Sequence, residues 1–310
     1  MYRNKIISLL VPCFNEEHTI KKVINDFRRY MPAIDIYVFD NLSTDSTKDI
    51  ALKANAEVRA VNSKGKGNVV RKAFADIESD IYILVDGDAT YDASSVTTLV
   101  DELIDHHLDM VIGKRVIDSF VPSKSYRFGH QFGNKFFNLL VSFIFKNQFT
   151  DIFSGYRVFS KRFVKSFPCL SDGFEIEAEL SIHALQIKAL CLEIPVQYRE
   201  RPEGSFSKLS TYSDGVKILF MVMKVFIYDK PLKFFGAIGL FCFLISTIIL
   251  IPIFNQYFLT HLVPRFPSLF VAIGFILSGI LSLFSGLILD VVTRGRIETK
   301  RMFYLNYPAV

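Results

Sequence analysis

Two aspartates stand at the end of a short apolar stretch. The segment DIYILVDGDATYD, residues 80–92, runs through apolar side chains straight into Asp86 and Asp88. Carboxylates this close repel each other, so we expect a basic side chain or a cation from solution beside them. Hard carboxylate oxygens suit Mg²⁺ or Mn²⁺, which commonly bridges protein carboxylates and substrate phosphates. An ordinary Asp-Gly turn has the same pattern, so the context must decide.

The elements around this pair predict an α/β fold. Apolar strands are expected at residues 5–12, 34–41, 56–62, 80–85 and 108–115, and helices at 16–31, from 43, 64–77 and 93–107. This alternation predicts a mostly parallel sheet covered on both faces. Ligands of such sheets bind at the carboxyl ends of the strands. The following residues fall at those ends: Pro12, Asn15, Asp40, Asp86, Asp88 and Arg115.

Two apolar runs follow the α/β region, Leu232–Phe254 and Ser268–Leu289. Each has about the 20 residues that a helix needs to cross a bilayer. A buried hairpin of soluble helices is the alternative, but neither run shows a polar face. Basic residues flank the outer ends of the pair, whereas the connecting loop carries only Arg265. The positive-inside rule then places both termini in the cytoplasm, and the N-terminus lacks the apolar core of a signal peptide.

These patterns divide the chain into a soluble domain at 1–210, a juxtamembrane amphipathic helix at 211–231, a membrane hairpin at 232–289 and a basic cytoplasmic tail at 290–310. The aromatic segments 132–147 and 215–231 fit either core helices or helices in the membrane interface, and the nearby spans favour the interface. In the second span, small residues recur every fourth position, and they would allow close packing against the first span or another subunit. They are Gly274, Ser278, Ser282 and Gly286.

Composition excludes several other classes of function. The net charge of +5 is modest, and its concentration beside the spans suits an anionic lipid surface or lipid substrate rather than nucleic acid. The 4 cysteines are scattered and read as free thiols, and the 6 histidines show no ligand spacing. No G-x-G-x-x-G follows the first strand, and no P-loop pattern occurs.

Six segments in order resemble the motifs of family-2 glycosyltransferases, in the branch that makes polyprenyl-phosphate sugars. They are VPCFNEE, DNLSTDST, KGKGNVVRKAF, DGDATY, GKR and RPEGSFSKL, and the resemblance covers residues 5 to about 215. It implies a GT-A fold and metal-dependent, inverting transfer of a hexose from a nucleotide sugar to undecaprenyl or another polyprenyl phosphate. The spans resemble those of the bacterial bactoprenol glucosyltransferases, which implies the inner membrane, favours UDP-glucose as donor and is consistent with a homotetramer.

The resemblance also implies roles for single residues. The nucleotide-sugar site would use Pro12, Phe14, Asn15, Glu16, Glu17, Asp40, Lys66, Asp86, Gly87, Asp88, Arg201, Ser207 and Lys208, with the metal on Asp86 and Asp88. The catalytic set would be Asp88, Asp151, Arg115 and Arg127, the two arginines near the acceptor phosphate. The second strand ends in Asp40-Asn41 where the family has two aspartates. The same branch includes the dolichyl-phosphate mannose synthases, and GSFSKL is one residue longer than their GESKL loop, which points away from them.

Plainer interpretations stand beside these roles. Asn15 and Glu16 could cap the first helix, Asp151 could form a structural ion pair with Arg157, and Lys64 and Lys66 could belong to a solvated loop. Arg115 could likewise be an ordinary charge at a strand end. Because a lipid phosphate is already a nucleophile, a general base is dispensable, and Asp151 could instead orient an arginine or the metal shell.

Three rival functions each fit part of the sequence. A processive polysaccharide synthase would carry a Q-x-x-R-W motif, but the chain has no tryptophan. A non-enzymatic membrane scaffold would bind a nucleotide without transferring sugar. The same chemistry could also use UDP-N-acetylhexosamine, UDP-galactose or GDP-mannose.

Overall fold

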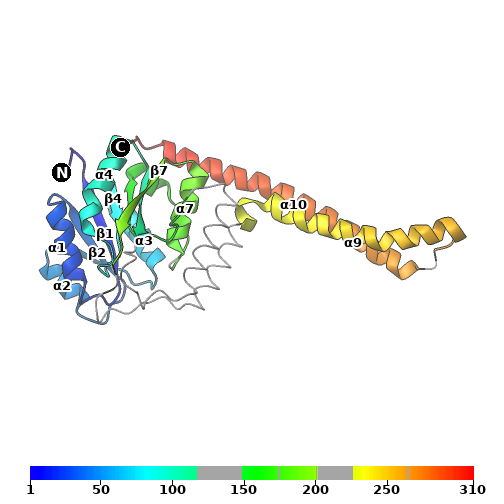
Figure 1. Cartoon of the computed structure of the whole chain (residues 1–310), viewed down its shortest axis with the longest axis horizontal. Coiled ribbons are helices and arrows are strands. Elements are labelled where there is room, and N and C mark those ends of the chain that lie inside the picture. Colours follow the sequence, from blue (N-terminus) through cyan, green and yellow to red (C-terminus); the bar gives the residue numbers. More distant parts are fainter. Residues whose placement is uncertain (117–148, 174, 200, 202–225, 264) are drawn as a thin grey trace. The chain divides into compact units, whose positions relative to one another are not determined.

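The computed structural model describes residues 1–116, 149–173, 175–199, 201, 226–263 and 265–310 (Figure 1). The chain divides into two compact units. The first comprises Met1–Ile218 together with Thr299–Val310, and the second comprises Leu219–Glu298. Of the predicted site residues, Arg127, Ser207 and Lys208 lie outside the described part of the chain, as do the segment 132–147 and most of 215–231.

A seven-stranded sheet of order β3-β2-β1-β4-β6-β5-β7 forms the first unit. Its strands are β1 (Ile7–Cys13), β2 (Asp35–Asp40), β3 (Glu57–Ala60), β4 (Ile81–Leu84), β5 (Met110–Val116), β6 (Arg157–Ser160) and β7 (Cys191–Gln197). Among these strands only β6 runs antiparallel to its neighbours, β4 and β5, which confirms the mostly parallel α/β sheet. The loop that enters β6 therefore lies at the edge where the other strands end.

Helices cover both faces of this sheet (Figure 1). They are α1 (Ile20–Tyr30), α2 (Thr47–Lys53), α3 (Lys66–Asp76), η1 (Ala93–Ser95), α4 (Val96–Asp105), α6 (Lys161–Ser166) and α7 (Ile176–Ile187). Apolar residues of α1, α2 and α4 pack on one face, and those of α3, α6 and α7 pack on the other. Successive side chains of a strand point to opposite faces, so Leu9 and Val11 join the first core and Leu10 the second.

Element boundaries differ from the sequence prediction, and two of the differences concern the end of the first strand and the start of the first helix. The first strand does not stop at Pro12 but continues to Cys13. Pairing with β4 extends only to Leu10, so the missing N–H of Pro12 interrupts no ladder on that side. The first helix begins at Ile20 rather than at Glu16, because the residues before it form a loop that contacts the start of α2.

The second unit contains α9 (Pro231–Thr260) and the part of α10 (Phe266–Leu305) that ends at Glu298. Both helices are long and apolar enough to cross a membrane, with mean hydropathies of 2.6 and 2.3 over their best windows. They enclose the two predicted spans, so length and composition support the membrane hairpin.

Small residues form the seam of this hairpin. Ser246 donates to the carbonyl of Ala272 at 3.0 Å, and a Cβ on Gly239 would lie 3.0 Å from the carbonyl oxygen of Gly279. Between residues 239 and 253 of α9 and between 272 and 293 of α10, the buried residues recur every seventh position; they are Gly239, Ser246 and Ile253 on α9 and Ala272, Gly279, Gly286 and Thr293 on α10. This is the seven-residue spacing of helices that pack along a long seam.

Of the four small residues that the sequence predicted to pack closely, only the last two, Ser282 and Gly286, therefore contact α9. Ser282 donates to the carbonyl of Phe235 at 2.8 Å, and a Cβ on Gly286 would lie 3.0 Å from that of Phe235. Ser278 is exposed, and a Cβ on Gly274 would meet no described atom within 4 Å. Residues spaced four apart move gradually around the helix relative to a seam that repeats every seven residues. Gly274 and Ser278 therefore do not lie on the seam.

The C-terminal end of α10, from Thr299, belongs to the first unit. Tyr304 is buried and donates to Asp109 Oδ2 at 2.9 Å, and the Arg162 guanidinium lies 4.7 Å from its ring centre. Arg301 donates to the carbonyl of Ile187, at the end of α7, at 3.0 Å. A cation at the C-terminus of a helix interacts favourably with its exposed carbonyls. Part of the predicted basic tail is thus built into the α/β unit.

Candidate functional site

The carboxyl edge of the sheet gathers most of the predicted residues. Asp40 ends β2, Asp86 and Asp88 follow β4, and Arg115 lies near the end of β5. Because β6 runs antiparallel, the loop before it brings Asp151 to the same edge. The sequence placed Asp40, Asp86, Asp88 and Arg115 at the carboxyl ends of strands, and the structure has them there, whereas the position of Asp151 at this edge was not predicted.

Asp88 is a buried carboxylate with defined partners. Its Oδ1 accepts from the backbone N of Thr90 at 3.2 Å and from the Thr90 hydroxyl at 2.6 Å. Its Oδ2 lies 2.8 Å from Arg201 Nη2. Burial and the neighbouring charge of Asp86 raise the pKa of Asp88, and Arg201 opposes that rise. Arg201, which the resemblance assigned to the diphosphate, therefore touches the predicted metal pair directly.

Asp86 is paired with a lysine. Lys66 Nζ lies 2.5 Å from Asp86 Oδ1 and 2.5 Å from Glu177 Oε1. Burial alone would lower the pKa of Lys66, but the two carboxylates outweigh burial and raise it. The Lys66 side chain is only 7% exposed, so its interpretation as part of a solvated loop is wrong.

Close packing explains the glycines on either side of Lys66. Gly65 has φ +127, a conformation that favours glycine. A Cβ on Gly65 would lie 2.1 Å from the carbonyl oxygen of Asp172, and one on Gly67 would lie 2.1 Å from that of Ser171. The backbone N of Gly67 donates to the Asp172 carbonyl at 3.0 Å. The 171–173 loop thus lies directly against the start of α3 and fixes the backbone of Lys66.

Asn41 holds the same segment from the other side. Its side-chain amide donates to the carbonyls of Val61 at 3.0 Å and Ser63 at 2.7 Å, and its Oδ1 accepts from the Gly65 N at 2.7 Å. An aspartate could accept the last bond but could not donate the first two. The departure from the two-aspartate pattern therefore has a structural reason.

The loop after β1 is tied to the loop before α2. Asn15 Oδ1 accepts from the Thr44 N at 2.8 Å, and the Asn15 N donates to the Ser43 hydroxyl at 3.0 Å. Glu17 Oε2 accepts from the Ser46 N at 3.0 Å. These contacts of Asn15 hold two loops together and do not cap α1. Glu16 does stay local, because its Oε2 accepts from the hydroxyl of Thr19, the residue before that helix.

Two further features beside these loops suit a planar, polar ligand. The Phe14 ring lies 5.4 Å from Lys64 Nζ. Asp40 is 8% exposed, and within the described part of the chain its Oδ1 has no hydrogen-bond partner. A buried acceptor without a partner is costly unless a ligand supplies the donor.

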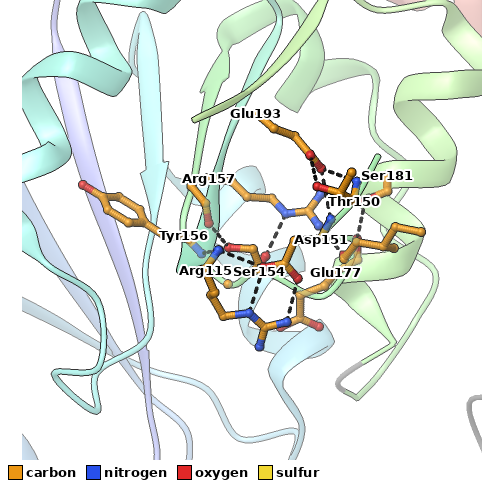
Figure 2. Close-up of polar contacts among 12 residues, drawn as sticks. Arg115, Thr150, Asp151, Ser154, Tyr156, Arg157, Glu177, Ser181 and Glu193 are labelled. Carbon is orange, nitrogen blue, oxygen red and sulfur yellow. Dashed lines mark hydrogen bonds and ion pairs between the residues drawn. The ribbon is translucent and has the colours of Figure 1, made fainter. Parts of the chain in front are cut away.

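Asp151 and Arg115 form a bidentate ion pair (Figure 2). Arg115 Nε and Nη2 lie 2.9 Å and 2.6 Å from the two carboxylate oxygens, and the Arg115 backbone N also donates to Oδ2 at 3.0 Å. Burial would raise the pKa of Asp151, but the bonds and charge of Arg115 outweigh it and lower the pKa. The arginine also lies 5.6 Å from the ring centre of Tyr198. The Asp151 carboxylate thus holds the Arg115 guanidinium by two side-chain bonds.

Arg157 was the ion-pair partner that the sequence suggested for Asp151, but its guanidinium makes hydrogen bonds to other residues. It is fully buried, and its guanidinium donates to the Ser154 carbonyl at 2.9 Å and to the Ser181 hydroxyl at 3.0 Å (Figure 2). It also donates to the carbonyl of Ile152. These bonds fix the 151–155 loop, while the ion-pair partner of Asp151 is Arg115.

Two residues of the site, Glu177 and Gly155, were missed by sequence reasoning. Glu177 belongs to the segment FEIEAEL, where Glu175 and Glu179 are equally acidic, and no signal separates the one that contacts Lys66. Gly155 gave no signal either, although a Cβ there would lie 2.4 Å from Asp86 Oδ2.

The residues present fit a divalent cation. Asp86 and Asp88 offer the hard oxygen ligands that Mg²⁺ and Mn²⁺ prefer, and the missing side chain of Gly155 leaves room beside Asp86 Oδ2. With Asp86, Asp88 and Glu177 ionised against Lys66 and Arg201, the cluster carries one net negative charge. A cation there would be electrostatically favoured.

Comparison with known sequences places this site in context. The model of glycosyl transferase family 2 matches residues 8–167. A glycosyltransferase of Haloferax volcanii, AglJ, is 35% identical over 234 residues, which are 75% of this chain and 76% of that protein. The protein RfbJ of Shigella flexneri is 50% identical over 131 residues, 42% of this chain and 100% of RfbJ.

Solved structures share the fold. The glucosyl-3-phosphoglycerate synthase of Mycobacterium tuberculosis, crystallised with uridine diphosphate, superposes with a TM-score of 0.59 at 21% identity, over 71% of this chain and 80% of that one. The same enzyme with Mn²⁺, UDP-glucose and phosphoglyceric acid gives a TM-score of 0.52 at 23% identity, over 64% and 73% of the two chains. The sheet described above is therefore a GT-A fold.

Proposed function

The chain belongs to glycosyl transferase family 2, and from this premise we propose that it transfers a hexose from a nucleotide diphosphate sugar to a polyprenyl phosphate. UDP-glucose is the preferred donor and undecaprenyl phosphate the preferred acceptor. The protein would lie in the cytoplasmic membrane as a homo-oligomer, with its α/β unit in the cytoplasm. Its product, a lipid-phosphate-linked sugar, would serve the modification of a cell-surface glycan.

The observation that carries this proposal is the cluster of Asp86, Asp88, Lys66 and Arg201 at the carboxyl edge of the sheet. A nucleoside diphosphate leaves readily only when its growing negative charge is neutralised. Mg²⁺ or Mn²⁺ held by Asp86 and Asp88 would supply part of that charge and polarise the diphosphate. Lys66 and Arg201, which already contact the acidic pair, would bind the remaining phosphate oxygens.

The donor's base would lie beside the loops after β1 and β2. Asp40 offers the unsatisfied buried oxygen that can accept an N–H from a base. Asn15 and Glu17 hold the loops on either side in place. The UDP complexes of the mycobacterial synthase, which share the fold, support a uridine donor.

Arg115 is the described residue best suited to the acceptor phosphate. Bidentate arginine matches phosphate geometry, and Asp151 and Tyr198 orient this guanidinium. Because the lipid phosphate is already a nucleophile, the site needs to position it and screen its charge rather than deprotonate it. The lowered pKa of Asp151 fits an orienting anion better than a general base. Attack opposite the leaving group would invert the anomeric carbon.

The two apolar helices support a lipid acceptor. The helices Pro231–Thr260 and Phe266–Leu305 have the length and hydropathy for a membrane hairpin. Anchoring the enzyme in the bilayer that holds the polyprenyl phosphate would raise the local concentration of acceptor and restrict its orientation. A soluble acceptor would give these helices no role in the reaction.

The test is a transfer assay with the full chain purified in detergent. Undecaprenyl phosphate and Mn²⁺ are incubated with radiolabelled UDP-glucose, UDP-N-acetylglucosamine, UDP-galactose or GDP-mannose, and label is counted in the organic phase. We expect label from UDP-glucose, and none after addition of EDTA. Label from another donor would correct the sugar. Nucleotide binding without label from any donor would instead support a non-enzymatic scaffold.

A further inference from the structure

Glu177 lies beside the proposed transfer site but has no place in the mechanism above. We propose that it is a positioning residue that keeps Lys66 as a built-in counter-cation of Asp86. A divalent cation arriving at Asp86 would then replace the lysine rather than add to it. The released ammonium would stay on Glu177, where it is available to the donor's diphosphate. This inference rests on the proposed function, because it assumes that the cation binds at Asp86.

The two carboxylates that share the lysine differ in access. Lys66 Nζ lies 2.5 Å from both, but the Glu177 side chain is 6% exposed and the Asp86 side chain is 31% exposed. A cation from solution can therefore reach Asp86 while Glu177 stays sealed behind the lysine. Only one of the two contacts is open to exchange.

Lys66 cannot follow the exchange by moving its backbone. The 171–173 loop lies against the glycines on either side of it, and Asn41 accepts from the N of Gly65. The ammonium must therefore remain within reach of its present site. An unpaired charge in the interior is costly, so once Asp86 is occupied, Glu177 is the described carboxylate left to hold Lys66.

Glu177 has the capacity to do so. Its Oε2 is buried and, in the part of the chain that the structure describes, has no hydrogen-bond partner. An ammonium carries three donors, so one released by Asp86 could engage this second oxygen. Burial raises the pKa of Glu177, and the neighbouring charge of Lys66 opposes that rise.

The exchange predicts opposite effects of two substitutions on cation binding. Lys66→Met removes the competing cation and should tighten Mn²⁺ binding by at least about tenfold. Glu177→Gln leaves Asp86 as the sole anionic partner of Lys66 and should weaken Mn²⁺ binding by at least about tenfold. A merely structural role of the pair predicts loss of affinity in both variants, because either change would loosen the site.

The measurement is titration of the purified full chain with Mn²⁺ alone, with free Mn²⁺ followed by electron paramagnetic resonance. Lys72→Met is the matched control, because Lys72 lies on the same helix but has a side chain that is 41% exposed and pairs with Asp76; it should leave the affinity unchanged. Circular dichroism and thermal unfolding verify that each variant is folded. If Lys66→Met does not fold, Lys66→Gln, which also removes the charge, takes its place beside Glu177→Gln.

The outcomes separate this inference from the proposed function. Opposite shifts support the exchange, whether or not the transfer assay labels the lipid. Equal or same-sign shifts overturn the exchange and leave the transfer reaction standing where label is found. Absence of Mn²⁺ binding in the unaltered chain overturns the exchange together with the metal assignment.

Discussion

Gly155 offers a sharp test of the geometry around Asp86. A methyl group added there would lie 2.4 Å from Asp86 Oδ2, 3.0 Å from its Cγ and 3.2 Å from Lys66 Nζ. Ordinary contact begins near 3.4 Å, so Gly155→Ala must push the carboxylate by about 1 Å. The backbone of Gly155 is not in the left-handed region, so alanine can adopt its conformation.

A displacement of about 1 Å in a catalytic group can reduce the rate about 100-fold. That factor corresponds to about 2.7 kcal/mol in the activation free energy. The free energy of unfolding should change by no more than about 1 kcal/mol, because the reduced entropy of the unfolded chain offsets part of the strain. We therefore expect a large loss of transfer in a protein that remains folded.

The assay compares initial rates of label transfer to undecaprenyl phosphate at saturating Mn²⁺, together with the midpoint of thermal unfolding. Gly236→Ala is the control, since a Cβ there meets no described atom within 4 Å. A Gly155→Ala variant that transfers sugar at the unaltered rate would refute the placement of Asp86 in the reaction. A variant that loses its fold would refute the claim that the strain falls on one side chain.

Three further predictions concern the same edge of the sheet. Asp88→Asn should abolish Mn²⁺-dependent transfer with the fold intact, and near-normal turnover would contradict the metal assignment. Asn41→Asp loses the bonds donated to Val61 and Ser63; urea unfolding should show a loss of about 2 kcal/mol, and an unchanged midpoint would count against the role of Asn41 as a clamp. The pKa of Asp151 is lowered by Arg115, so its contribution to stability is present above its ordinary pKa of 3.8 and is lost as the pH falls through the lower folded value. Asp151→Asn should therefore destabilise the protein more at pH 6 than at pH 3, and an equal effect at both would refute the ion pair.

The sequence was sufficient for the sheet and for its acidic edge because both depend on local patterns. Apolar segments such as residues 80–85 read as strands, and parallel strands bring their carboxyl ends together. The antiparallel β6 was not predicted, since its direction is set by pairing with β4 and β5 rather than by its own residues. That one reversal is what brings Asp151 to the site.

The contacts made by residues far apart in the chain could not be predicted from local sequence patterns. Glu177 contacts Lys66 across 111 positions of the chain, and Tyr304 contacts Asp109 across 195. Such contacts depend on how helices pack on the sheet, and neighbouring glutamates of the same helix carry no sign of which one is turned inward. Asn41 is the opposite case. The sequence showed that it departs from the two-aspartate pattern of the family, but only the structure shows the hydrogen bonds that explain the amide.

The central claim is that Asp86 and Asp88 bind the divalent cation that carries the donor's diphosphate. Its most direct test is a crystal of the full chain grown with Mn²⁺ and uridine diphosphate, with the anomalous signal of manganese measured. We predict a peak within coordination distance of both carboxylates and of the diphosphate oxygens. A manganese peak or a diphosphate bound away from this pair would contradict the claim.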